Sequence, residues 1–158
     1  MKVYIVRHGI AEDYHPDGDA ARELTETGRK KAKKMIQFIE KSAKPDVLLT
    51  SPFIRAVQTA ELAAGVFGMK KKVEYSDALL PGSGSSDVLI ELCARNEDSV
   101  FLFGHNPHLS ELVSDLISGG TAEIQLKKAS ITLVDFDGKP EAGRGLLKWM
   151  ITPGILDI

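Results

Sequence analysis

Arg7, His8 and Gly9 follow directly after the first apolar run of the chain, Val3 to Val6. An arginine and a histidine therefore stand where a strand should give way to a loop. In an open α/β sheet, ligands bind at the carboxyl ends of the strands. A protein core would reject an unpaired arginine beside a histidine, so an anion is the natural missing partner. This position predicts phosphate chemistry.

Two later strand ends carry side chains suited to the same chemistry. Arg55 falls in the first turn of a helix that begins near Ser51, and His105 follows a second strong apolar run, Ser99 to Phe103. The carboxyl ends of parallel strands share one edge, so four side chains should converge there. They are Arg7, His8, Arg55 and His105. A phosphoryl site needs a nucleophile or base and several donors around three oxygens, and the planar fork of arginine binds two oxygens at once.

About six strands are predicted from the apolar runs that must position these residues. The strands are expected over residues 2–6, 47–49, 73–75, 99–103, 130–136 and 146–151, with a turn at 70–72. The first and fourth runs are nearly continuous, which is typical of strands buried on both faces. The last two, joined around Asp137 and Gly138, should close the sheet as an antiparallel edge.

Segments with helical spacing alternate with these strands. The first helix is expected to begin at Thr25 and to continue to Ile39, and the second is expected over 53–67. A third should follow the loop 82–86, and a fourth is expected over 107–118. Thr25 suits the cap of the first helix. Such alternation predicts an α/β fold: a three-layer α/β/α sandwich with a mixed, mostly parallel sheet.

Composition favours one domain, residues 1–158, because 43% hydrophobic content over this length supports one well-buried core. Lys and Arg number 20 against 22 Asp and Glu, so no basic field would recruit nucleic acid or anionic lipid. No signal peptide or membrane-spanning stretch is recognisable. We therefore expect a cytoplasmic protein with no nucleic-acid or membrane partner.

Several other residues favour ordinary structural roles. The lone Cys93 excludes an intramolecular disulfide, and its helical setting predicts a buried thiol rather than a nucleophile. His15 lies in an acidic loop and is expected to be solvated, whereas a position at the rim of the site is left open for His108. Trp149 is expected to belong to the core.

Three segments of the chain resemble the motifs of the histidine phosphatase superfamily. They are Arg7-His8-Gly9, Ser51-Pro52-Phe53-Ile54-Arg55-Ala56-Val57-Gln58-Thr59 and Gly104-His105-Asn106-Pro107. The resemblance covers motifs from residue 2 to 108 and implies a phosphoglycerate mutase-like fold. Small size and the Leu24-Thr25-x-x-Gly28 helix opening are most similar to the SixA-type phosphohistidine phosphatases of that superfamily.

The resemblance implies that His8 is the nucleophile and forms a phosphohistidine intermediate that water then hydrolyses. Neutral imidazole is a competent nucleophile near physiological pH. Arg7, Arg55 and a protonated His105 are implied to bind the phosphoryl oxygens and stabilise the transition state. Three further residues are expected to line the phosphate or substrate. They are Gly9, Ser51 and Asn106.

A general acid is not evident in the sequence. Asn106 stands where superfamily acid phosphatases carry an aspartate that donates a proton, and an amide cannot do so. Asp77 and Asp87 are the nearby acids, but neither matches the glutamate of the phosphoglycerate mutases. A missing acid matters least for a leaving group that departs easily, such as a phosphorylated imidazole. The sequence therefore favours a phosphohistidine phosphatase acting on a phosphorylated protein.

Other functions stay open on the sequence alone. A small-molecule phosphomonoesterase or a phosphoglycerate mutase-like enzyme would need a lid, and the loop 9–23 is the only sizeable candidate. Its acidic residues would repel a sugar phosphate. A phosphate-binding module without turnover would not need His8. No metal or cofactor is expected, because Glu12 and Asp13 lack partners at ligand spacing.

Overall fold

The computed structural model describes residues 1–69 and 73–156, and within them six strands form one sheet of order β3-β2-β4-β1-β5-β6. The strands are β1 (Lys2–Arg7), β2 (Val47–Thr50), β3 (Val73–Tyr75), β4 (Ser99–Gly104), β5 (Ile131–Asp135) and β6 (Leu146–Ile151). β1 to β4 run parallel, as predicted. The turn predicted at 70–72 lies outside the described residues.

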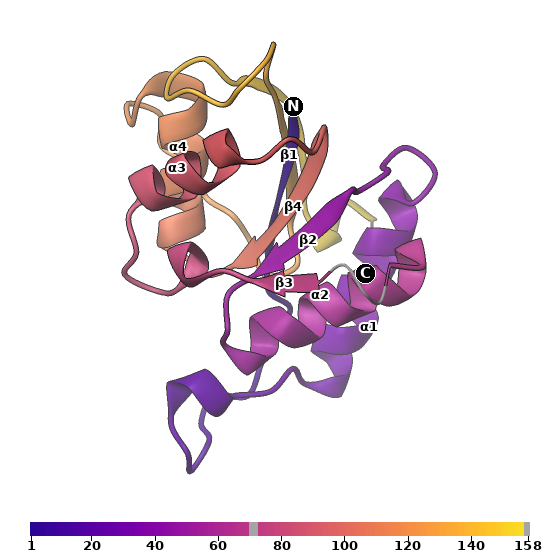
Figure 1. The fold of residues 1–158 in the computed structure, drawn as a ribbon. Coiled ribbons are helices and arrows are strands. Elements are labelled where there is room, and N and C mark those ends of the chain that lie inside the picture. The colour runs from indigo at the N-terminus through magenta and orange to yellow at the C-terminus, as the bar shows by residue number, and fades with distance from the viewer. Residues whose placement is uncertain (70–72, 157–158) are drawn as a thin grey trace.

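Helices cover both faces of this sheet and confirm the three-layer α/β/α architecture (Figure 1). They are α1 (Glu26–Ile39), α2 (Ile54–Phe67), α3 (Ser85–Ala94) and α4 (His108–Ser118). Among the described residues, the short 3-10 turns η1 (Asp19–Ala21) and η2 (Asp77–Leu79) lie in connections, and η3 (Pro153–Leu156) follows β6. α1 and α2 pack on one face of the sheet, and α3 and α4 on the other.

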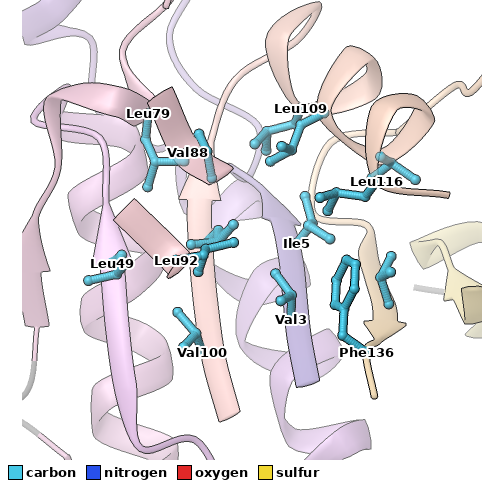
Figure 2. Close-up of a cluster of buried hydrophobic side chains, with 14 of the residues drawn as sticks. Val3, Ile5, Leu49, Leu79, Val88, Leu92, Val100, Leu109, Leu116 and Phe136 are labelled. Carbon is cyan, nitrogen blue, oxygen red and sulfur yellow. The ribbon is translucent and has the colours of Figure 1, made fainter. Parts of the chain in front are cut away.

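β1 shows why a continuous apolar run is needed at the centre of the sheet. Val3 and Ile5 point into the cluster beneath α3 and α4 (Figure 2). Tyr4 and Val6 join the cluster beneath α1 and α2, where Tyr4 stacks on Phe101 of β4 with ring centroids 4.2 Å apart. Alternate side chains point to opposite faces of a strand, so both faces of β1 are core.

The last two strands close the sheet as the predicted antiparallel edge. β5 pairs antiparallel with β1, and β6 pairs antiparallel with β5. β5 is shorter than predicted because residues 130 and 136 lie outside its ladder. Trp149 of β6 is partly buried and meets Tyr4 edge-on, so it packs against the core from the edge strand and is not one of the buried core residues.

The start of α1 is pressed against the loop that follows β1. The Thr25 hydroxyl accepts a hydrogen bond from the Gly28 N–H at 3.0 Å and so caps the helix, as predicted. A Cβ at Gly28 would lie 1.9 Å from the carbonyl oxygen of Ile10. Glycine is therefore required at position 28 to let the helix approach the loop.

The predicted burial of Cys93 is wrong. Its side chain is exposed at the end of α3, where the Sγ atom contacts the carbonyl oxygen of Pro140 at 3.1 Å. Helical spacing alone did not show which side of α3 faces the sheet, and Val88 and Leu92 are the helix residues buried there.

None of the helices in the described ranges combines the length and apolar character needed to cross a membrane.

Candidate active site

The register of the central strands brings the two predicted histidines together. Arg7 at the end of β1 pairs with Gly104 at the end of β4. The next residues, His8 and His105, therefore leave neighbouring strands at the same edge of the sheet. Their ring centroids lie 5.1 Å apart, and both side chains are buried, with 6% and 2% exposure.

His8 is held in a defined orientation by its own backbone. Its Nδ1 atom lies 2.7 Å from the carbonyl oxygen of Gly9. A carbonyl can only accept, so Nδ1 carries the proton and Nε2 keeps its lone pair. Burial, together with the charges of Arg55, Arg7 and Lys128, lowers the pKa of His8 to about 4 against the raising effect of the Gly9 hydrogen bond. His8 is therefore a neutral imidazole with a free nitrogen at neutral pH.

His105 is fixed by a hydroxyl from the neighbouring strand end. Its Nε2 atom lies 2.9 Å from the Oγ atom of Ser51, which follows β2. The Phe53 ring meets the imidazole edge-on at 5.2 Å between centroids. Burial lowers the pKa of His105 to about 3, and the charge of a protonated His8 adds to this effect. His105 is therefore neutral at neutral pH, and a bound dianion would raise its pKa.

Arg7 is anchored beside the two histidines by the segment before β5. Its Nη1 atom donates to the carbonyl oxygen of Leu126 at 2.7 Å. The Ala129 N–H donates to the carbonyl oxygens of both Arg7 and His8, at 3.1 and 3.0 Å. Burial lowers the pKa of Arg7, but a guanidinium stays charged at neutral pH. The site thus receives a fixed positive charge next to His8.

Arg55 reaches the site from the first turn of α2. Its guanidinium lies 5.2 Å above the centre of the Phe53 ring. Two of its nitrogens are engaged by Asp19: Nη1 donates to the backbone carbonyl at 2.6 Å, and Nη2 donates to the carboxylate at 2.9 Å. This contact was not predicted from the sequence.

Three buried nitrogens around His8 have no hydrogen-bond partner among the described residues. They are Nε of Arg7, Nε of Arg55 and Nδ1 of His105. Buried donors are normally paired, and leaving them unpaired is costly. The charges of Arg7 and Arg55 act on a neutral imidazole with a free nitrogen, an arrangement that suits an anionic ligand.

The three further residues predicted at the site all lie at these strand ends. Ser51 holds His105. Asn106 follows it and donates from Nδ2 to the Leu126 carbonyl at 3.1 Å, which ties α4 to the segment that anchors Arg7. The Gly9 N–H donates to Thr59 at 3.2 Å while its carbonyl accepts from His8, so the polar backbone groups of Gly9 are engaged within the protein.

The two carboxylates considered as proton donors lie in η2 and in α3. Asp77 begins η2 and Asp87 lies in the first turn of α3, where it accepts from the Gly84 N–H at 3.3 Å. Within the described residues, neither makes a hydrogen bond or ion pair with the predicted site residues. His108 is buried with 2% exposure rather than placed at the rim, and burial lowers its pKa. His15 is partly exposed and lies 3.8 Å from Asp17.

Sequence reasoning missed several residues that hold the site together. Thr59 accepts from the Gly9 N–H and donates to the Arg55 carbonyl at 2.7 Å, so one hydroxyl joins the end of β1 to α2. Gln58 accepts from the Leu24 N–H at 2.7 Å. Both lie in the motif block quoted above, and their position there was the available signal. For Asp19, the sequence showed only an acidic residue in a loop and nothing that predicted its contact with Arg55.

In the part of the chain that the structure describes, no group of three or more His, Cys, Asp or Glu side chains could hold a metal ion. The positive groups of the site are side chains of the protein itself.

Comparisons with known proteins find relatives of this chain in both sequence and structure. The family model of the histidine phosphatase superfamily (branch 1) matches residues 3–80. An uncharacterized protein of Picosynechococcus sp. is 36% identical over 138 residues, which cover 83% of this chain and 82% of that protein. The phosphohistidine phosphatase SixA of Escherichia coli (strain K12) is 30% identical over 158 residues, with 97% and 94% covered.

Solved structures show the same likeness. The protein histidine phosphatase SixA complexed with tungstate superposes with a TM-score of 0.88 at 27% identity, over 99% of both chains. A phosphoserine phosphatase from Entamoeba histolytica has a TM-score of 0.71 at 18% identity, over 96% of this chain and 97% of that one. At that identity the second likeness concerns the fold alone.

Proposed function

Because this chain belongs to the histidine phosphatase superfamily and is a phosphohydrolase, we propose that it removes the phosphoryl group from phosphohistidine on a protein, through a covalent intermediate on His8. One observation carries this proposal. His8 keeps a free ring nitrogen in a buried site where Arg7, Arg55 and His105 each hold a nitrogen without a partner. SixA, to which the chain is similar over nearly its whole length, is a phosphohistidine phosphatase.

In the first step, the Nε2 lone pair of His8 forms a bond to phosphorus, and the phosphorus–nitrogen bond of the substrate breaks. The electron pair of that bond stays on the departing imidazole. Arg7 and Arg55 balance the charge of the three phosphoryl oxygens as it shifts in the transition state. These groups are already fixed by Leu126 and Asp19, so little reorganisation is needed when the substrate binds.

In the second step, a water oxygen attacks phosphorus and the bond to Nε2 breaks. The electron pair returns to His8, inorganic phosphate forms, and the proton of the water passes to phosphate or solvent. The proton stays on Nδ1 of His8, hydrogen-bonded to the Gly9 carbonyl, throughout, which keeps the same ring nitrogen directed at phosphorus in both steps. His105 donates to a phosphoryl oxygen while Ser51 holds its other nitrogen.

The lack of an evident acid supports a labile substrate. Asn106 cannot supply a proton, and Asp19, the carboxylate in contact with Arg55, has its pKa lowered by hydrogen bonds from Arg22 and Arg55. An alkoxide leaving group would need that proton, whereas an imidazole departs as a neutral ring when its other nitrogen is protonated. Phosphohistidine is therefore the substrate class that these residues suit best.

The test is turnover and trapping with wild type, His8→Asn and His15→Ala. Asparagine keeps a donor near the Gly9 carbonyl but offers no nucleophile, and His15 is a matched histidine of the neighbouring loop that lies outside the proposed machinery. We expect wild type and His15→Ala to release phosphate from a phosphohistidine protein faster than from 3-phosphoglycerate or p-nitrophenyl phosphate. His8→Asn should release none.

Rapid quenching should trap an acid-labile, base-stable phosphate on wild type and His15→Ala only. Label on another residue would overturn the role of His8. Faster hydrolysis of 3-phosphoglycerate would replace the proposed substrate by a small metabolite. Phosphate binding without hydrolysis of any of the three compounds would indicate a binding module.

A further inference from the structure

The loop 9–23 sends one acidic residue back onto a buried arginine of the site. Asp19 begins η1 on the part of this loop that projects beyond the sheet (Figure 1). Its side chain is 56% exposed, whereas the Arg55 side chain that it contacts is 6% exposed. Backbone and carboxylate oxygens of Asp19 each accept one Arg55 hydrogen bond, at 2.6 and 2.9 Å. A surface residue therefore fixes the far end of a buried guanidinium.

Asp19 is itself held by a second arginine. Arg22 donates from Nη1 to Oδ1 of Asp19 at 2.7 Å, which leaves Oδ2 for Arg55. Arg22 also donates from Nε to the Glu12 carbonyl across the loop. The base of the loop is closed by the bridge between Ala11 and Leu24. The carboxylate thus has a fixed position rather than a free one.

We infer that Asp19 is a positioning residue for Arg55: it fixes the guanidinium so that its remaining N–H groups stay available to the phosphoryl group bound at His8. This inference rests on the proposed function. Guanidinium carries five N–H donors, and Asp19 engages two of them. Three N–H groups of Arg55, one on each Nη nitrogen and the one on Nε, therefore stay outside the contact with Asp19.

Asp19 assists the reaction because the Arg55 side chain is already ordered before the substrate binds. An unrestrained arginine side chain loses rotamer entropy when it is ordered, and donors that are already oriented act on a transition state without reorganisation. Arg22 and Arg55 lower the pKa of Asp19, so the carboxylate stays charged and cannot serve as the proton donor. Its contribution therefore passes through Arg55.

The same contact could instead block the site, if Asp19 and the phosphoryl group competed for Arg55. The two readings predict opposite results when the carboxylate is removed. If Asp19 positions Arg55, removing its carboxylate weakens transition-state stabilisation, so kcat falls. If Asp19 blocks the site, removing its carboxylate frees Arg55, so kcat/KM rises and inorganic phosphate binds more tightly.

The experiment compares wild type with Asp19→Ala, Asp19→Asn and Asp17→Asn. Asp17 lies in the same loop with an 82% exposed side chain and no contact with Arg55, so Asp17→Asn controls for the loss of one loop charge. We expect Asp19→Ala to lower kcat by roughly 10- to 100-fold, the range for a misplaced catalytic group, with a smaller change in KM. Asp19→Asn should recover part of this loss because its amide oxygen still accepts from Nη2. Asp17→Asn should match wild type.

Binding of inorganic phosphate, measured by calorimetry, is the second readout and needs no turnover. It should weaken in Asp19→Ala and partly recover in Asp19→Asn. Unchanged or tighter phosphate binding, or kcat at or above the wild-type value, would overturn the positioning role. If wild type bound phosphate but hydrolysed none of the three compounds, the proposed function would fail, while the binding series would still decide the role of Asp19.

Discussion

Lowering the pH should destabilise this protein through His8 in a way that one substitution can isolate. Burial lowers the pKa of His8 to about 4 in the folded protein, from 6.5 in an unperturbed histidine. Between these values the unfolded chain binds a proton that the folded protein does not. Stability is therefore fully present above pH 6.5 and is lost as the pH falls toward 4.

One pKa unit corresponds to about 1.4 kcal/mol, so His8 should make unfolding roughly 2 to 3 kcal/mol easier at pH 4.5 than at pH 7.5. Other groups also titrate in this interval, and His8→Asn removes the contribution of His8 together with its effect on the pKa of His105. The wild-type loss of stability should exceed the loss in His8→Asn by that amount.

The assay is urea unfolding of both proteins at a series of pH values, with the free energy of unfolding extrapolated to water and the slope m checked for constancy. NMR titration of the His8 ring gives an independent value for its pKa. Equal losses of stability in the two proteins, to within about 0.5 kcal/mol, would refute the reasoning, since the titration must appear as a stability difference.

Two further predictions concern the groups that hold the site. Gly28→Ala should destabilise the fold by about 1 to 3 kcal/mol, because its Cβ would meet the Ile10 carbonyl oxygen at 1.9 Å. Gly65 is an exposed position inside α2 with nothing within 4 Å of an added Cβ, so Gly65→Ala should instead stabilise the fold by roughly 0.5 to 1 kcal/mol. Thermal unfolding measures both variants. Equal effects of the two substitutions would show that the contact with the Ile10 carbonyl oxygen does not matter. Ser51→Ala should lower kcat roughly 10-fold by releasing the His105 ring, and it should also lower the melting temperature because the buried Nε2 of His105 loses its partner. Unchanged kcat in steady-state assays would show that the hydroxyl does not orient that ring.

The central strands could be predicted because burial on both faces leaves a direct mark in the sequence. β1 and β4 are continuous apolar runs, and each is followed at once by a histidine. Parallel pairing of Arg7 with Gly104 then brings His8 and His105 together. This prediction did not require the exact pairing register of β1 and β4, because His8 and His105 each follow directly after the end of a strand.

Contacts within loops could not be predicted in the same way. Asp19 lies among other acidic residues of the loop 9–23, and nothing in their spacing distinguishes the one that reaches Arg55. The exposure of Cys93 likewise depends on how α3 is rotated against the sheet. Both outcomes depend on packing between segments far apart in the chain.

The sequence by itself determined the fold class and the order of the strands and helices along the chain. It also identified the residues at the strand ends whose side chains can take part in a reaction. Apolar periodicity and local motifs encode these features. Only the tertiary structure decided the state of those residues. The free Nε2 of His8 follows from the Gly9 carbonyl, and its lowered pKa follows from burial. The orientation of Arg55 follows from Asp19. Solvation and long-range hydrogen bonds set protonation and orientation, and they exist only once the chain has folded.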